Sequence, residues 1–367
     1  MEDWLIDDSE LPLERKSLLP GEGFFVPDEV ADRREDARVA ERAAGADVLV
    51  VADPDADGLA CVAILRAALG EAALVPAGPH ELGGGLARAA EHGPEGCRVF
   101  VCDLAPDAVA DVADELAALV EHAGAVRWFD HHRWDDDVAA AVRDAGVDLV
   151  VGHSEEECTA DVALRSLDAD LPDRFADLAA VTRDHDLWVN DDPRSQDLAD
   201  YAHWTDPEEY VDVVYEHGPD LPPEAADFLA ERRVEKEALI QRAVDRGALR
   251  EVGPWTVGVT YGRCSQNEVA DGLREEGADA AVVVKPAGSA SIRGSEAFEA
   301  CHLVARKVRG GGHPRAAGCK PDVYEDMLDY AHHWTTQGAV TKQVILDAFR
   351  DLARELEAGE LEVEGEV

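Results

Sequence analysis

Three short apolar runs, each followed or ended by an aspartate, constrain the fold of this chain more than any other feature. The runs and their aspartates are residues 48–52 with Asp53, residues 99–102 with Asp103, and residues 126–129 with Asp130. Apolar runs of this length, alternating with amphipathic segments, are typical of buried strands in a parallel α/β sheet. Because ligands of such sheets bind beyond the carboxyl ends of the strands, the three carboxylates are expected to converge on one site.

The segments that follow the sheet pattern predict a second domain. A charged segment with helical spacing at residues 222–247 predicts a connecting helix. Further strands are expected at residues 256–260, 280–285 and 291–293, with a Gly-rich turn at 310–312. The predicted regions are a lead-in at 1–45, a catalytic domain at 46–220, a helical linker at 221–248, a smaller α/β domain at 249–325, and C-terminal helices with an acidic tail at 326–367.

Composition limits the class of protein and its partners. The chain has 367 residues, of which 79 are acidic and 34 basic, giving a net charge of -45, yet 46% of its residues are hydrophobic, which indicates a folded protein. Such acidity fits the salt-rich cytoplasm of a halophile, and a halophilic archaeon is the predicted source. It argues against a general nucleic-acid coat, which would present basic faces. The seven cysteines show no zinc-type spacing, and no stretch is long and apolar enough to span a membrane, so a soluble cytoplasmic protein is expected.

The first motif, Asp53-Pro54-Asp55-Ala56-Asp57-Gly58, follows the first predicted strand. Three carboxylates at alternate positions require partners or a cation when they leave water. A calcium-binding EF-hand loop begins with the same pattern but needs a glutamate at its twelfth position, where this chain has Ile64. A hard divalent cation in a different kind of site is therefore predicted, with a simple Asp-rich turn as the alternative.

Asp103 forms the second motif, and the third and fourth motifs add histidine to the carboxylates. Asp130-His131-His132 ends the third predicted strand, and Asp184-His185-Asp186 follows a stretch, 158–180, that reads as helical. Asp103 taken by itself favours the N-cap of the next helix, and its value as a candidate ligand comes from its position relative to the other strand ends. Together these residues predict a site rich in oxygen ligands with few imidazoles, which suits manganese or magnesium better than zinc.

A fifth motif lies in the second predicted domain. It combines Ser291 and Arg293 with the run Gly310-Gly311-Gly312-His313-Pro314-Arg315. Consecutive glycines let backbone N–H groups approach an anion, and a guanidinium can bind phosphate through two hydrogen bonds. A phosphate-binding surface is the functional interpretation, and an ordinary loop is the alternative.

The order of these motifs resembles the DHH phosphoesterase superfamily, with the aspartate form of the first motif as in RecJ-like members, and GGGHPRAAG resembles the signature of the DHHA1 domain that follows DHH domains. The resemblance implies a parallel-sheet DHH domain joined by a helical linker to a smaller α/β DHHA1 domain. By position, the implied metal ligands are Asp53, Asp55, Asp57, Asp103, His131, Asp184 and Asp186, with the choice between the last two left open. Asp103 would bridge two Mn²⁺ ions, or Mg²⁺ in their place.

The same resemblance implies the remaining roles. Asp130 would orient its neighbours, His132 would contact the phosphate, and Ser291, Arg293, Gly311, Gly312 and His313 would bind the substrate. The implied activity is two-metal hydrolysis of short oligonucleotides (nanoRNA) or of cyclic or linear dinucleotides, as in oligoribonuclease-like members. The alternatives are a RecJ-like 5′-to-3′ single-strand exonuclease and, as a non-enzyme, a nucleotide sensor or a scaffold of a replication complex. The oligomeric state is open, with a homodimer as one option.

Overall fold

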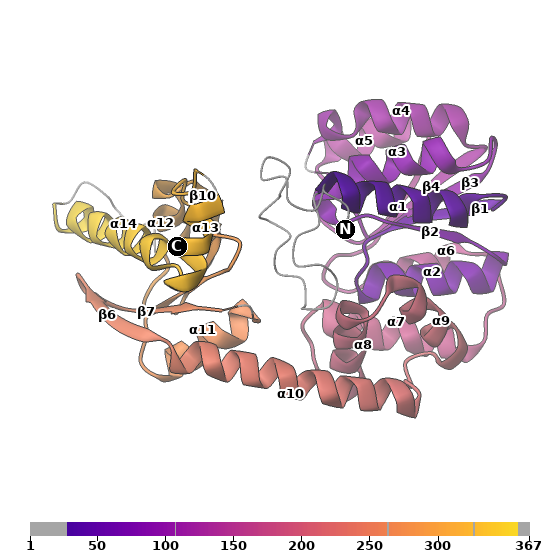
Figure 1. The fold of residues 1–367 in the computed structure, drawn as a ribbon. Coiled ribbons are helices and arrows are strands. Elements are labelled where there is room, and N and C mark those ends of the chain that lie inside the picture. Colours follow the sequence, from indigo (N-terminus) through magenta and orange to yellow (C-terminus); the bar gives the residue numbers. More distant parts are fainter. Residues whose placement is uncertain (1–27, 107, 263, 326, 359–367) are drawn as a thin grey trace, which may run out of the picture. The chain divides into compact units, whose positions relative to one another are not determined.

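The computed structural model describes residues 28–106, 108–262, 264–325 and 327–358. The chain forms two compact units, the first spanning Asp32–Glu231 and the second built mainly from the chain after Arg232 (Figure 1). Helix α10 (Pro223–Asp245), predicted from its charged helical pattern, runs across the boundary between them. Each unit contains one sheet, and the predicted mixed α/β class is confirmed.

The first unit is built on a five-stranded parallel sheet with the order β2-β1-β3-β4-β5. Its strands are β1 (Val48–Ala52), β2 (Ala73–Pro76), β3 (Arg98–Cys102), β4 (Ala125–Asp130) and β5 (Asp148–Val151). Register aligns Ala52 with Cys102 and Cys102 with Phe129. The three predicted strands are therefore neighbours that end at the same level, and the aspartates that end them lie at one edge of the sheet.

Helices cover both faces of this sheet because its side chains alternate between two apolar layers. Val50 and Phe100 contribute to one layer, while Val51 and Trp128 contribute to the other. The first layer is completed by α2 (Ala56–Leu69), α6 (Thr159–Ser166), α7 (Asp173–Asp186), α8 (Pro193–Trp204), α9 (Pro207–His217) and the start of α10. The second is completed by α1 (Asp28–Ala43), α3 (Leu82–His92), α4 (Ala113–His122) and α5 (Asp136–Asp144), and short 3-10 turns occur at Pro79–Glu81 and Val109–Asp111.

One element of this unit differs from the expectation drawn from sequence, and one lies in the region assigned to the lead-in, where a helix around residues 27–44 was expected. The stretch 158–180, predicted as one helix, is two helices, α6 and α7. Pro172 lies at the N-cap of α7, where its missing N–H costs nothing, and the residues before it are not helical. Helix α1, assigned to the lead-in, places Val39 and Ala43 in the core of the first unit.

The second unit contains a six-stranded mixed sheet with the order β10-β11-β9-β8-β7-β6. Its strands are β6 (Ala248–Val252), β7 (Trp255–Tyr261), β8 (Ala280–Val284), β9 (Ala290–Gly294), β10 (Gly310–Gly312) and β11 (Ala316–Cys319). Its helices are α11 (Gln266–Glu275), α12 (Cys301–Lys307), α13 (Met327–Thr335) and α14 (Ala339–Glu357). Helices α12 and α14 pack on one face through residues such as Val304 and Phe349, whereas α11 packs on the other through Val269 and Leu273.

The expectation of a turn at the glycine run Gly310–Gly312 is wrong, because the run forms the edge strand β10. The glycines allow the backbone of β10 to lie close to the backbone of β11. A Cβ on Gly310 would lie 2.1 Å from the carbonyl oxygen of Gly318, and Gly312 has a φ of +138°. The run therefore serves strand packing, and the chain reverses after it, at residues 313–315.

All seven cysteines are free thiols, and six of them are buried. Within the described residues, no helix is long and apolar enough to cross a membrane. The acidic tail beyond residue 358 lies outside the described residues.

Candidate metal centre

Asp57, in the first turn of α2, is the deepest carboxylate of the first motif. Its oxygens accept the backbone N–H groups of Thr159 at 2.6 Å and Ala160 at 2.8 Å, both at the start of α6. Burial, reinforced by the charges of Asp186 and Asp55, raises the pKa of Asp57 to about 8. Two N–H donors do not offset this burial, so the site favours an added positive charge beside the carboxylate.

The other two aspartates of the first motif shape the strand-to-helix turn. Asp55 is the N-cap of α2 and accepts the N–H groups of Asp57 and Gly58, both at 3.0 Å. A Cβ at position 58 would lie 2.3 Å from the carbonyl oxygen of Asp53, so only glycine allows the helix to begin this close to the strand end. Burial and the nearby charge of Asp55 raise the pKa of Asp53 to about 7.

Asp103 follows β3 in a conformation that non-glycine residues rarely adopt, with a φ of +61°. Its side chain is 4% exposed and accepts the hydroxyl of Thr159 at 2.8 Å. Burial, together with the charges of Asp57, Asp55 and Asp130, raises its pKa well above the usual range. Residues held in such strained backbone cluster at functional sites, which favours a functional role over a simple helix cap.

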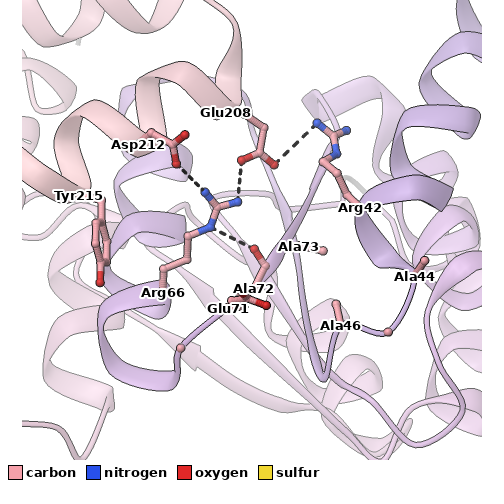
Figure 2. Close-up of a pocket in the computed structure, with 12 residues that line it drawn as sticks. Arg42, Ala44, Ala46, Arg66, Glu71, Ala72, Ala73, Glu208, Asp212 and Tyr215 are labelled. Carbon is pink, nitrogen blue, oxygen red and sulfur yellow. Dashed lines mark hydrogen bonds and ion pairs between the residues drawn. The ribbon is translucent and has the colours of Figure 1, made fainter.

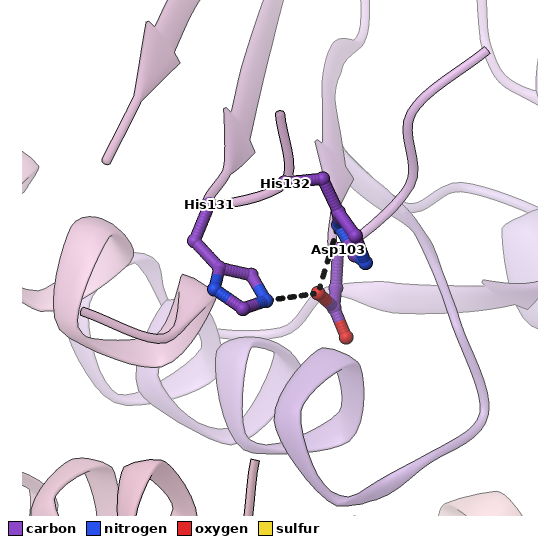
Figure 3. Close-up of side chains that lie close together, drawn as sticks. All are labelled: Asp103, His131 and His132. Carbon is purple, nitrogen blue, oxygen red and sulfur yellow. Dashed lines mark ion pairs between the residues drawn. The ribbon is translucent and has the colours of Figure 1, made fainter. Parts of the chain in front are cut away.

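The histidine pair after β4 faces this carboxylate. Nε2 of His131 and Nδ1 of His132 each lie 3.8 Å from Oδ1 of Asp103 (Figure 3). Asp130 is fully buried, and each of its oxygens has one partner. Oδ1 lies 2.7 Å from Nδ1 of His132, and Oδ2 accepts the Nε1–H of Trp134 at 2.6 Å. The hydrogen bond with Asp130 is the largest cause of the raised pKa of His132.

The fourth motif separates into two parts. Oδ2 of Asp186, the last residue of α7, lies 3.2 Å from Nε2 of His131. The carboxylate of Asp184 instead accepts the N–H groups of Asp191 at 3.0 Å and Asp192 at 3.1 Å. The structure therefore brings Asp186 to the cluster and uses Asp184 to hold the loop after α7.

Among the described residues, two groups of side chains offer ligand atoms within 4.8 Å of one another. They are Asp103 with His131 and His132, and Asp57 with His131 and Asp186. Neither group contains Asp53 or Asp55. Buried Nδ1 of His131 and Oδ2 of Asp186 have no hydrogen-bond partner. Carboxylates with raised pKa values beside orphaned polar atoms fit one or more divalent cations that prefer oxygen with some nitrogen.

A pocket of about 170 Å³ opens beside this cluster. Residues of the first motif and of helices α7 and α8 line it: Pro54, Asp55, Ala56, Asp57, Thr182, His185, Asp186, Ala199 and His203. Sequence reasoning missed His203, as well as the two contacts that Thr159 makes with Asp57 and Asp103. Only the tertiary fold brings α6 and α8 to the ends of the strands.

The predicted substrate residues of the second unit lie on two strands, β9 and β10, that are separated by β11. Ser291 and Arg293 are on β9, which pairs with β11, and Arg293 Nη1 donates to the carbonyl of Ala317 at 3.3 Å. Gly311, Gly312 and His313 are exposed at the adjoining edge strand and turn. Gln266 and Asn267, at the start of α11 and missed from sequence, accept hydrogen bonds from Ser291 and Arg293.

A second pocket, about 760 Å³, lies away from these residues, at the amino ends of β1 and β2 (Figure 2). Arg66 spans it, donating to Glu208 at 2.6 Å and to the carbonyl of Ala72 at 3.0 Å. Glu208 also lies 3.7 Å from Arg42. These paired charges link α1, α2 and α9, which indicates bracing of the first unit at the edge opposite the carboxylate cluster.

No protein-family model and no curated protein matches the chain. Solved structures do match. The exonuclease RecJ bound to manganese is similar over 86% of this chain and 94% of that chain, at 20% identity and a TM-score of 0.53. RecJ in complex with Mn²⁺ from Thermus thermophilus is similar over 95% of this chain and 57% of that chain, at 19% identity and a TM-score of 0.54. A third match is the DHH domain of a protein from a family of ribosomal proteins, with 13% identity, 88% and 89% coverage and a TM-score of 0.50. These likenesses show that the chain has the two-sheet α/β fold of the RecJ and DHH-domain structures.

Proposed function

We propose that this protein is a metal-dependent phosphodiesterase that hydrolyses short oligonucleotides or linear or cyclic dinucleotides, with two Mn²⁺ as its cofactor. The observation that carries the proposal is the meeting of Asp57, Asp103, His131 and Asp186 at the carboxyl edge of a parallel sheet. Support also comes from the fold shared with RecJ structures that contain bound manganese.

Each residue of the cluster has a part in the proposed reaction. Asp57, Asp103, His131 and Asp186 would hold the cations, which when bound polarise phosphoryl oxygens and lower the pKa of water. Asp130 holds the His132 ring through its 2.7 Å contact with Nδ1. That contact leaves Nε2 of His132 to donate to a phosphoryl oxygen and to stabilise charge on it.

The second unit would bind another part of the substrate. Arg293 has the planar donor set that binds phosphate, and Asn267 holds its Nε at 2.7 Å. Exposed Gly311, Gly312 and His313 would extend the proposed substrate surface, whereas Ser291 is buried and its hydroxyl donates to Gln266. A net charge of -45 disfavours a long track of nucleic acid, since binding to many phosphates requires many basic residues. Short substrates are therefore preferred over long ones.

A 5′-to-3′ single-strand exonuclease is the second candidate, favoured by the likeness to RecJ over most of this chain. Comparing pApA, cyclic di-AMP and a labelled 20-nucleotide single strand in molar KCl with Mn²⁺ separates the two. Faster turnover of the dinucleotides supports the proposal, whereas processive shortening of the long strand supports the exonuclease.

The test of the metal chemistry uses matched variants. Asp103→Asn and His131→Ala are expected to abolish hydrolysis while the protein stays folded by circular dichroism. Asp148→Asn, a change at an exposed carboxylate on the amino end of β5, serves as the control and is expected to retain activity. EDTA should stop the reaction and Mn²⁺ should restore it. Hydrolysis that is unaffected by EDTA, or full turnover by Asp103→Asn, contradicts the proposal, and binding without hydrolysis in wild type indicates a sensor.

A further inference from the structure

Trp188, two residues after the end of α7, is the most unusual apolar side chain of the first unit. It exposes 77% of its surface, and the neighbouring Val189 exposes 54%. Its φ is +57°, in the left-handed region that bulky residues rarely adopt. An exposed indole on strained backbone costs free energy without a packing gain, and such combinations cluster at ligand sites.

The loop that carries Trp188 is fixed by hydrogen bonds. The N–H groups of Leu187 and Trp188 donate to carbonyls of α7, and those of Val189 and Asn190 both donate to the carbonyl of Asp184 at 3.0 Å. The next two N–H groups, as described above, donate to the Asp184 carboxylate. Every backbone N–H from residue 187 to residue 192 is therefore satisfied. Such a loop presents the indole without first having to become ordered, which reduces the entropy cost of binding.

This indole lies next to the candidate metal centre. Asp186, two residues earlier, belongs to the ligand group with Asp57 and His131. His185 lines the adjoining pocket. The centroids of the His185 and Trp188 rings lie 6.3 Å apart, and the angle between the two ring planes is 26°. Two nearly parallel aromatic rings thus extend from the pocket to the surface.

From this arrangement we propose that Trp188 is a positioning residue on which a nucleobase of the substrate stacks while its phosphodiester lies at the carboxylate cluster. The inference rests on the proposed function and adds to it the part of the substrate that is recognised. An indole offers a flat apolar face to any base, so recognition would tolerate different sequences.

The charges around Trp188 favour a base over a phosphate as the group it contacts. Asp184, Asp186, Asp191 and Asp192 all lie within four residues of it along the chain. Carboxylates repel a phosphate but leave stacking on an uncharged base largely unaffected. In molar salt, where attraction between exposed charges is screened, an apolar contact also keeps its strength.

The experiment compares Trp188→Ala, Trp188→Leu and Trp188→Phe with the matched control Val189→Ala on the same loop. The substrates are pApA and the same diester with abasic sugars in place of both adenosines. For pApA, we expect kcat/KM to fall about tenfold in the Ala and Leu variants because KM rises. In the Phe variant and in the control, kcat/KM should stay within about threefold of wild type. For the abasic diester, all variants should match wild type. The Leu variant keeps an apolar side chain without a flat face, so it separates stacking from simple hydrophobic contact.

A second measurement does not depend on turnover. Adenosine monophosphate, added to metal-free protein, should quench tryptophan fluorescence in wild type and clearly less in Trp188→Phe. Unchanged pApA kinetics in both the Ala and Leu variants, or equal losses on both diesters, would overturn the stacking role while leaving the phosphodiesterase intact. If wild type hydrolyses neither diester with Mn²⁺, the proposed function fails, and the fluorescence comparison alone then decides whether Trp188 binds bases.

Discussion

Nε2 of His131, at the end of β4, and Oδ2 of Asp186, at the end of α7, lie 3.2 Å apart. The contact joins two motifs that are distant in the sequence, and buried Oδ2 has no hydrogen-bond partner. Asp186 therefore faces the carboxylate cluster with an oxygen that could bind a cation, whereas Asp184, on the same helix, has its carboxylate engaged by the following loop.

Asp186→Asn is expected to bind less Mn²⁺ than wild type, and Asp184→Asn to keep the full amount, because only the first substitution removes a charged ligand from the cluster. Metal content after dialysis, measured by mass spectrometry or by calorimetric titration, checks this. Loss of metal in Asp184→Asn with full retention in Asp186→Asn would reverse the assignment.

Asp130→Asn is expected to lower kcat about 10- to 100-fold while the protein keeps its Mn²⁺, because groups that orient residues at a metal site have effects of this size. The carboxylate holds both His132 and Trp134, and an amide can accept at only one of its two positions. Steady-state kinetics together with metal content test the prediction. A variant that has wild-type kcat would show that His132 does not need this partner.

The metal-free protein is expected to lose stability as pH rises from about 4 to 8. The folded-state pKa of Asp53 is about 7 and that of Asp57 about 8, above the ordinary value of 3.8. Between these values the folded state binds more protons than the unfolded state, so the free energy of unfolding falls as pH rises. Bound Mn²⁺ should flatten this dependence, because it stabilises the ionised carboxylates.

Urea unfolding at pH 5 and pH 8, with EDTA or with Mn²⁺, measures this difference. Asp57→Asn in EDTA serves as the control and should depend on pH less steeply than wild type. Metal-free protein that is more stable at pH 8 than at pH 5 would contradict the raised pKa values.

Arg66→Ala is expected to destabilise the first unit by about 2 kcal/mol, since it removes charged hydrogen bonds that are partly buried and leaves Glu208 with less compensation. Arg133→Ala is the matched control. Its partner Glu155 lies 3.2 Å away, but both side chains are more than 80% exposed, so the change should stay within about 0.5 kcal/mol. Urea denaturation followed by circular dichroism compares the two. Equal effects would mean that the Arg66 network does not brace the helices.

The local pattern of the sequence was enough to predict the main strands of the first sheet and the aspartates at their ends. Apolar runs such as Val48–Ala52 are too short for buried helices, and the parallel arrangement follows from the helices between them. Residues Asp57, Asp103, His131 and Asp186 were predicted as ligands, and the structure places them together.

Only the tertiary structure shows that Asp186 faces the cluster and that Asp184 does not, because both flank His185 and their directions depend on how α7 ends and where its loop turns back. It also brought Thr159 to the cluster, through the packing of α6 on α2, which no local pattern encodes. The glycines of β10 were misread for a related reason. The sequence shows that residues 310–312 are glycines without side chains. Only the packed sheet shows that a side chain at Gly310 would collide with β11.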